Sequence, residues 1–361
     1  MSRQSELAEL SRVYDSSALS NRNLVINGAM QINQRGSQTV NSSDGDQFGP
    51  DRFRMIGSGI DQFVGTIAQD SDSPTGFGSS FKLTTTTAET AIDAAEYFYV
   101  LQSIEANTLQ ALKYGTSSAE KVTLSFHVKS SVTGTFGITL YKVDNTSQIQ
   151  TKTYTISSAS TWEYKTVTFD ANTLTGGAIN NDTGEGLQVA FHLAAGSNFK
   201  GTDTSSGWAN YSGAAWAEGH AQDGVITTLN ATWQITGVQL EIGDTATPFE
   251  HRSVGDELAR CQRYFNDIIK SAGSEYIWFF PLAGASLPYR RLNLIFPVEM
   301  RATPSLVNGA ATVGGGGSLS GSGVTLSNAS ESTAIINGDI ASSDDVSYTY
   351  LTRAQLDAEI P

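Results

Sequence analysis

The 361-residue sequence has few of the groups on which catalysis and nucleic-acid binding depend. Its single cysteine, Cys261, excludes an intrachain disulfide and a cysteine-rich zinc site. Lys and Arg number 22 against 36 Asp and Glu, which gives a net charge of −14. Because binding to a phosphate backbone needs an excess of basic residues, we expect neither DNA nor RNA as a partner.

Signals for membranes and secretion are also absent. No apolar run approaches the roughly 18 residues that a membrane-spanning helix needs, so we expect no membrane insertion. The polar start MSRQSELAEL has neither the basic nor the apolar part of a signal peptide. We therefore expect synthesis in a cytoplasm without export by the Sec route.

Catalytic and cofactor-binding motifs are missing as well. The sequence contains no phosphate-binding glycine loop, dinucleotide fingerprint or Gly-x-Ser-x-Gly elbow. The histidines, His127, His192, His220 and His251, lack the spacing of metal ligands, and the strand pattern predicts that the first two face outward. The sequence thus predicts no catalytic residue, no cofactor and no enzyme. A carboxylate pair for glycoside hydrolysis stays open, because the two acids need only be about 5 to 10 Å apart in space.

The sequence does contain a long series of segments with the period-two alternation of half-buried strands. In Lys121–Lys129, apolar residues at even positions alternate with polar residues at odd positions, which is typical of a sheet with one core face and one solvent face. Clusters of Gly, Asn, Asp and Ser separate the segments. The further predicted strands are Asn23–Asn33, Arg52–Ile56, Gln62–Gln69, Ser80–Thr86, Tyr97–Ile104, 136–140, Thr151–Ser157, Tyr164–Phe169, 187–193 and Thr232–Ile242.

About eleven strands with turns between them predict an all-β fold, an antiparallel jelly-roll β-sandwich. One strand changes the parity of its apolar residues. Trp233 and Ile235 lie on one parity, whereas Val238 and Leu240 lie on the other, with Gly237 at the change. We predict a β-bulge at this glycine, because a bulge restores a single core face.

Four parts follow one another along the chain. Residues 1–20 are predicted to form a short helical segment for attachment or oligomerisation, and residues 21–252 the sandwich. Residues 253–270 are predicted to form a connecting amphipathic helix, and residues 271–361 a small C-terminal β-module. Cys261 falls in the apolar stripe of the connecting helix, so we expect a buried small residue and not a reactive thiol.

The most suggestive candidate site is the segment Ser205–His220, where aromatic residues stand among Gly, Ala and Ser. Exposed aromatic rings stack on the apolar face of a sugar, while Asp and Asn side chains bind its hydroxyls. The alternative is that the rings pack inward and hold the loop on the sandwich or on a neighbouring subunit. The candidate glycan ligands are Trp208, Tyr211, Trp216, Asp203 and Asn210, with Glu218 as a further acceptor.

Carboxylates also gather in the segment DGDQFGPD, where Asp44, Asp46 and Asp51 form a weak candidate Ca²⁺ site. The segment departs from the EF-hand spacing beyond its second Asp. The alternative, which we favour, is a polar loop capped by its own Asp side chains. The sequence therefore predicts no metal.

Five stretches ordered along residues 5–265 carry a resemblance to a known family. They are NRNLVINGAMQ from Asn21, the step Asp51–Phe53, KVTLSFHVKSSVTGTFGITL from Lys121, ITGVQLEIGDTATPFEHRS from Ile235 and ELARCQRYF from Glu257. Together they resemble bacteriophage tail-fibre and virion structural proteins, and FPVEMRATPSL near the C-terminus is similar to a β-module often attached to them. The resemblance implies a jelly roll like that of carbohydrate-binding modules and a homotrimer, and it transfers no catalytic residue.

The hypothesis that follows is a structural virion protein of a tailed bacteriophage. Its leading version is a homotrimeric tail fibre or tail-tip adhesin, located in the tail and made in the host cytoplasm. The expected partners are further copies of itself, other virion proteins and host cell-surface polysaccharide, for which three weak sites act together. The alternatives are a capsid decoration protein or head fibre on the capsid surface, and a polysaccharide depolymerase.

Overall fold

The computed structural model describes residues 21–41, 47–201, 204, 207–269, 277–279, 289–314, 319–340 and 348–360. The chain divides into two compact units, Met1–Ser253 and Val254–Pro361. The short helix predicted for residues 1–20 lies outside the described residues. Within the described ranges, no helix is long and apolar enough to cross a membrane.

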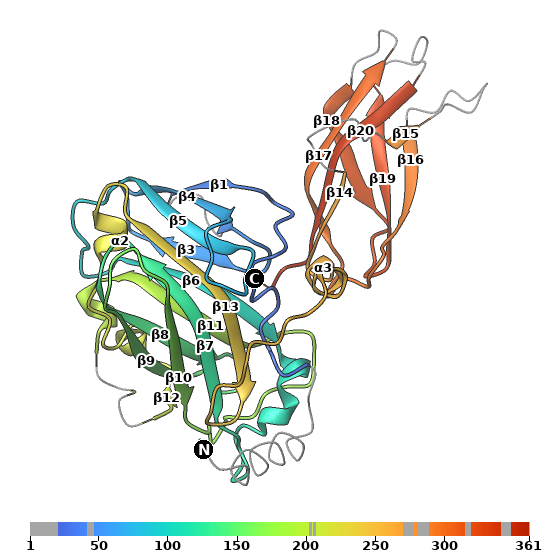
Figure 1. Cartoon of the computed structure of the whole chain (residues 1–361). Helices are drawn as coiled ribbons and strands as arrows, with labels where there is room; N and C mark the ends of the chain where they lie inside the picture. The colour runs from blue at the N-terminus through green and yellow to red at the C-terminus, as the bar shows by residue number, and fades with distance from the viewer. Residues whose placement is uncertain are drawn as a thin grey trace. The chain divides into compact units, whose positions relative to one another are not determined.

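The first unit is the predicted antiparallel β-sandwich (Figure 1). One sheet has six strands in the order β1 (Gln38–Asn41), β4 (Val64–Asp70), β5 (Ser80–Thr87), β13 (Thr232–Ile242), β7 (Val122–Ser130) and β10 (Glu163–Phe169). The other has seven in the order β12 (Ala209–Asn210), β9 (Gln148–Ile156), β8 (Gly134–Lys142), β11 (Glu185–Ala195), β6 (Tyr97–Glu105), β3 (Arg54–Ser58) and β2 (Gln47–Phe48). Short helical turns connect them: η1 (Ala106–Leu112), η2 (Ser197–Phe199), η3 (Gly213–Ala215) and α2 (Gly224–Thr227).

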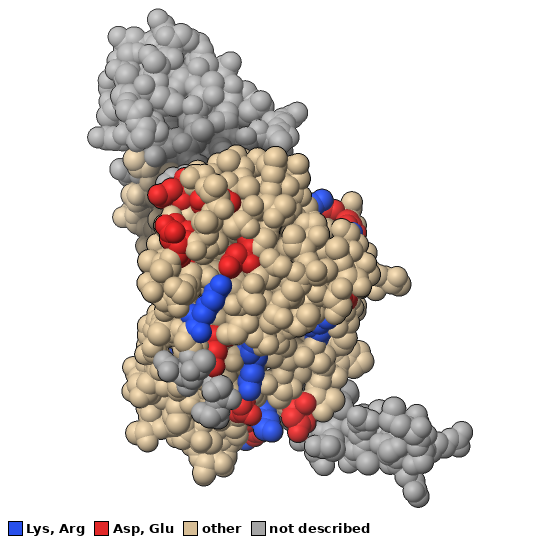
Figure 2. All heavy atoms as spheres, turned by 90° about the vertical axis from the view of Figure 1, so that its left-hand side faces the viewer, with Lys and Arg blue, Asp and Glu red and all other residues tan. Residues whose placement is uncertain are grey.

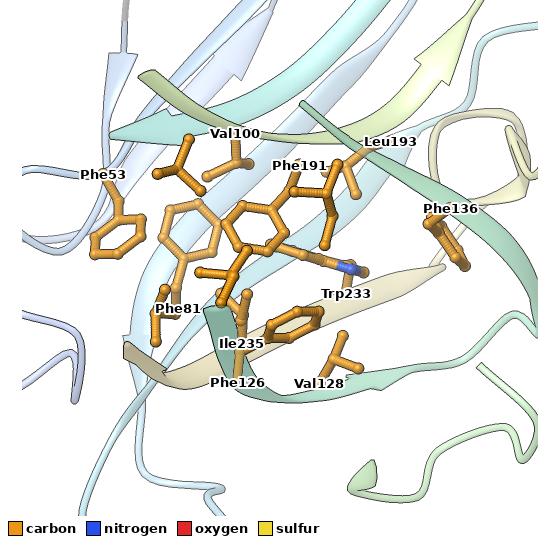
Figure 3. Close-up of a cluster of buried hydrophobic side chains, with 14 of the residues drawn as sticks. Phe53, Phe81, Val100, Phe126, Val128, Phe136, Phe191, Leu193, Trp233 and Ile235 are labelled. Atoms are coloured by element: carbon orange, nitrogen blue, oxygen red, sulfur yellow. The ribbon is translucent and has the colours of Figure 1, made fainter. Parts of the chain in front are cut away.

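Apolar side chains from both sheets meet in one core. Phe126 and Trp233 come from the six-stranded sheet, Phe136 and Phe191 from the seven-stranded sheet, and all four are fully buried (Figure 3). The rings of Phe126 and Phe191 meet edge to face, with centroids 5.3 Å apart, and the Trp233 indole N–H donates to the Tyr154 hydroxyl at 3.2 Å. Each buried ring stabilises the fold by roughly 1.5 to 3 kcal/mol. The alternation along each strand therefore decides which residues point outward.

The bulge predicted in β13 is confirmed. The pairing of β13 with β7 shifts register between Thr236 and Gln239, and Gly237 has a φ of +63°. Val238 and Leu240 beyond the bulge are as fully buried as the residues before it. The extra residue thus keeps one core face along the whole strand.

The strand predicted for Asn23–Asn33 was wrong, because this segment forms turns. Its residues Asn27 and Met30 have φ values of +59° and +56°. Side-chain amides here replace a strand partner: the Asn23 Nδ2 donates to the Val238 carbonyl, and its Oδ1 accepts from the Leu240 N–H. Asn side chains compete with the backbone for such bonds, which the apolar periodicity does not reveal.

In the second unit, the predicted connecting helix is shorter than expected. Helix α3 runs over Val254–Gln262 with Cys261 fully buried, as predicted, and residues Phe265–Ile269 form strand β14. Pairing with β20 gives β14 backbone partners along one side, which outweighs the helical spacing of its apolar residues.

The remaining strands of this unit form two small antiparallel sheets, as predicted for a β-module. One sheet joins β14, β20 (Tyr348–Asp357), β15 (Ile277–Phe279) and β17 (Ser305–Gly314), and the other joins β16 (Tyr289–Ile295), β19 (Thr333–Ile340) and β18 (Leu319–Ser327).

Charged side chains of the first unit form local pairs. The Lys129 Nζ lies 2.6 Å from the Asp72 carboxylate, and the Lys82 Nζ lies 2.8 Å from that of Asp70. On the face shown in Figure 2, Lys, Arg, Asp and Glu side chains are sparse and lie among one another. That face offers no broad basic patch.

Replacing Gly237 by alanine tests the packing at the bulge. An L-residue at φ +63° is strained, and the new Cβ would lie 2.6 Å from the Phe77 ring. We expect Gly237→Ala to lower the free energy of unfolding by about 3 kcal/mol in denaturant titrations. Gly36→Ala is the matched control, because φ is +72° there but nothing lies within 4 Å, and we expect a loss of about 1 kcal/mol. Equal losses would contradict the steric account.

Candidate functional site

The outer face of the seven-stranded sheet carries aromatic residues where three neighbouring strands meet. On β6, Phe98 and Val100 enter the core, so Tyr97 and Tyr99 face outward. The same alternation places Tyr141 of β8 and Gln188 of β11 on this outer face, where they are directly paired across the two strands. The rigid strands therefore fix the floor of a site.

The segment 196–223 follows β11 and contains η2, β12 and η3; its described residues, which we call the long loop, lie on this face. At its start, the backbone of the loop packs tightly against the segment before β6, because a Cβ added at Gly196 would lie 2.0 Å from the Asp93 carbonyl oxygen. Hydroxyls of the sheet hold its far part, because the Thr139 Oγ1 donates to the Trp216 carbonyl at 2.6 Å and the Thr151 Oγ1 donates to the Ala215 carbonyl at 3.1 Å. The loop adds Phe199, Tyr211 and Trp216 to the strand residues.

Strands and loop together enclose a groove with a volume of about 200 Å³. Six rings line it in an unbroken series of contacts. Ring centroids are 5.2 Å apart for Phe199 and Tyr97, 5.6 Å for Tyr97 and Tyr99, and 5.5 Å for Tyr99 and Trp216. The series continues at 5.4 Å to Tyr141 and 5.0 Å to Tyr211. We call this the aromatic groove; its residues are Tyr97, Tyr99, Tyr141, Gln188, Phe199, Tyr211 and Trp216.

Polar groups of the aromatic groove are hydroxyls and one amide. Burial raises the pKa of Tyr211, and electrostatic interaction with Tyr141 and Tyr97 raises it further. The Gln188 Nε2–H donates to Glu185 Oε1 at 3.0 Å. Burial also raises the pKa of Glu185, against the opposing effect of its hydrogen bonds and of Arg54. Of the described residues that line the groove, none is charged.

The structure brings two of the predicted glycan ligands together and separates a third. Tyr211 and Trp216 both line the aromatic groove, with ring centroids 6.1 Å apart; Tyr211 is 48 % exposed and Trp216 only 7 %. Trp208 lies elsewhere, because its indole N–H donates to the Asp170 carbonyl at 2.7 Å and its ring packs on Tyr114. The inward-packing alternative therefore fits Trp208, and it also fits the buried ring of Trp216, which packs in a hydrophobic cluster with strand residues.

Of the predicted polar ligands, Asn210 and Glu218 do not line the aromatic groove. Asn210 is exposed on β12, where its Oδ1 lies 3.4 Å from the Gln148 Nε2. Glu218 accepts hydrogen bonds from the N–H and hydroxyl of Thr204 within its own loop. Asp203 lies outside the described residues.

The candidate Ca²⁺ site is represented only by Asp51, since Asp44 and Asp46 lie outside the described residues. Asp51 is buried, and its two carboxylate oxygens accept from the N–H and the side-chain amide of Gln34. Burial raises the pKa of Asp51. Among the residues that the structure describes, no group of three or more His, Cys, Asp or Glu is placed to hold a metal ion.

His192 was predicted to face solvent, but the loop covers it completely. The single proton of the Thr139 hydroxyl is donated to the Trp216 carbonyl, so the His192 Nε2, 2.8 Å from the same oxygen, must donate to it. Burial holds the pKa of His192 well below its ordinary value of 6.5. The prediction for His127 is met in part, because it lies half-buried on the outer face of the other sheet against Phe77 and Tyr164.

His220 supports the loop in the same neutral state. Its Nδ1 accepts the Gly137 N–H at 3.1 Å, which leaves the proton on Nε2, 3.1 Å from the Asp223 carboxylate. Burial lowers the pKa of His220, although Asp223 acts in the opposite direction. The loop is therefore held by two imidazoles without charge.

Sequence analysis missed Tyr97, Tyr99, Tyr141, Gln188 and Phe199. A signal existed for four of them: Tyr97, Tyr99 and Gln188 stand at outward positions of predicted strands, and Tyr141 directly follows one. Three of the four are tyrosines, which are unusually large for a solvent face. The strand residues come together because β8, β11 and β6 are neighbours in the sheet, and the periodicity of the sequence does not reveal this strand order.

No family model and no curated protein matches this chain. Similar solved structures include the enzymatically active domain of tailspike protein 4 from bacteriophage CBA120, at 14 % identity and a TM-score of 0.33, covering 61 % of this chain and 21 % of that chain. A putative sugar binding protein from Bacteroides thetaiotaomicron has 9 % identity and a TM-score of 0.32, with 61 % and 99 % covered. The xylan-binding CBM22-1 domain of Xyn10C from Paenibacillus barcinonensis has 10 % identity and a TM-score of 0.27, with 64 % and 100 % covered. Likenesses this distant carry no argument about ligand or activity, and this chain spans about a fifth of the tailspike chain.

The neutral histidines predict a loss of stability in acid. Below about pH 6.5 the unfolded chain binds protons that buried His192 and His220 do not, so the free energy of unfolding should fall as the pH decreases from 7 to 5. Each histidine contributes at most about 1.4 kcal/mol per pH unit. Denaturant titrations at pH 7, 6 and 5 measure this slope.

The variant His192→Gln keeps a donor for Thr139 but removes the titrating group, so its slope should be smaller by the share of one histidine. His251→Gln is the matched control for the substitution itself, because it replaces an exposed histidine. A slope in His192→Gln equal to that of the unaltered protein would contradict this account.

Proposed function

We propose that the aromatic groove binds carbohydrate and that the chain is a non-enzymatic glycan-binding protein of a bacteriophage particle. The observation that carries this proposal is the unbroken series of six aromatic rings around a small groove with an amide on its floor. Aromatic faces stack on the C–H face of a pyranose, and hydroxyls and amides bind its hydroxyl groups. A flat hydrocarbon ligand would leave the polar groups of the groove without hydrogen-bond partners.

The groove supports binding more than hydrolysis. Hydrolysis of a glycoside needs two carboxyl groups about 5 to 10 Å apart across the scissile bond. The described lining of the groove contains none, and Glu185, which accepts a hydrogen bond from Gln188, is not among the lining residues. We therefore propose an adhesin and not a depolymerase.

The particle setting of the proposal comes from the sequence resemblance to tail-fibre and virion proteins. We propose a homotrimeric tail fibre or tail-tip adhesin that touches host cell-surface polysaccharide. A small groove gives weak affinity by itself, and three copies on one fibre multiply it. The purified chain should then have three times its 38.4 kDa mass in light scattering.

Removing one exposed ring tests the proposal. Tyr211→Ala deletes a wall of the aromatic groove at a position that is 48 % exposed, so the fold should persist. We expect it to weaken binding of the purified protein to host cells, or its block of phage adsorption, by tenfold or more, which corresponds to about 1.4 kcal/mol.

Tyr164→Ala provides the matched control. Tyr164 is 51 % exposed and lies on the other sheet, so its removal should change neither stability nor adsorption. The proposal fails if the unaltered protein does not bind host cells, or if the two variants behave alike.

A further inference from the structure

We infer that the aromatic groove accepts one uncharged pyranose unit and rejects sugars that carry a carboxylate. The inference rests on the proposed function, and it adds the size and charge class of the ligand. Three observations carry it: the volume of the groove, its lack of charge, and the fixed orientation of the amide on its floor.

The volume limits the length of the ligand. At about 200 Å³ the groove is smaller than the roughly 300 to 1,000 Å³ of sites for drug-sized molecules. The rings of Tyr97 and Trp216 each contact the ring of Tyr99, and the ring of Tyr211 contacts that of Trp216. A single sugar ring fits this space, whereas an oligosaccharide extends beyond it.

The charges near the groove exclude an acidic sugar. A carboxylate taken out of water needs a cationic partner, and the described lining offers none. Arg54 of the neighbouring strand β3 is 4 % exposed and acts electrostatically on Glu185. The net charge of −14 adds a weak repulsion at a distance.

Glu185 also sets which groups of Gln188 the ligand meets. A carboxylate oxygen accepts hydrogen bonds, so the NH₂ end of the Gln188 amide must point to Glu185. The amide oxygen and the second N–H then remain for the groove. A sugar hydroxyl both donates and accepts and can use both groups, whereas a carboxylate only accepts and would face the amide oxygen.

Matched sugars test the inference with the full-length protein. The probes are methyl β-glucoside with methyl β-glucuronide, and methyl β-galactoside with methyl β-galacturonide, titrated in ligand-observed NMR. We expect at least one neutral glycoside to bind and its uronide to bind at least tenfold more weakly. We also expect the tetrasaccharide of the binding sugar to gain less than tenfold over its methyl glycoside.

A variant that adds a positive charge at the groove tests the same inference by changing the protein instead of the sugar. Tyr211→Lys places an ammonium at the exposed rim, so the affinity for the uronide relative to the neutral glycoside should rise about tenfold. Tyr164→Lys, on the other sheet, should leave that ratio unchanged.

The outcomes separate this inference from the proposed function. Equal or stronger uronide binding, a tenfold or larger gain with chain length, or cell binding that depends on Tyr211 without binding of either neutral glycoside, would overturn the inference and leave the adhesin proposal standing. If Tyr211→Ala leaves adsorption unaltered and no sugar binds, the proposed function fails as well.

Discussion

The hydroxyl of Thr139 is the group on which the arrangement of the groove depends. It lies beneath the long loop, donates to the Trp216 carbonyl and accepts from His192. A hydroxyl buried without such partners would cost about 1 to 3 kcal/mol, so sheet and loop are stable in this position only together. The loop in turn carries Trp216 and Tyr211 to the tyrosines of β6 and β8. A polar contact under the loop thus creates an aromatic surface above it.

The strands and the loop contribute different parts of this site. The strands give a rigid floor, because Phe98 and Val100 on their inner face are locked in the core while Tyr97 and Tyr99 face outward. The loop gives two of the walls and is held by hydrogen bonds to neutral histidine and threonine side chains. The shape of the groove is therefore set before any ligand arrives, and little ordering entropy is left to lose on binding.

The local parts of this structure could be predicted from the sequence, and the tertiary parts could not. Alternation predicted the sandwich, the change of parity predicted the bulge at Gly237, and helical spacing predicted the burial of Cys261. Asn23–Asn33 has strand-like apolar residues, yet its side-chain amides bond the backbone of β13. The sequence also does not reveal which aromatic residues of the loop reach the sheet, because this depends on how the loop packs. Tyr211 and Trp216 reach the aromatic groove, whereas Trp208 packs on Tyr114. All three residues lie in the same aromatic-rich segment, so the sequence pattern could not distinguish them.

A crystal structure of the full-length protein with a bound sugar tests the central claim most directly. The account predicts one sugar ring in the aromatic groove, in contact with the rings of Tyr99 and Trp216 and hydrogen-bonded to the Gln188 amide. A sugar bound instead on the outer face of the six-stranded sheet, beside Tyr164, with an empty groove would contradict it.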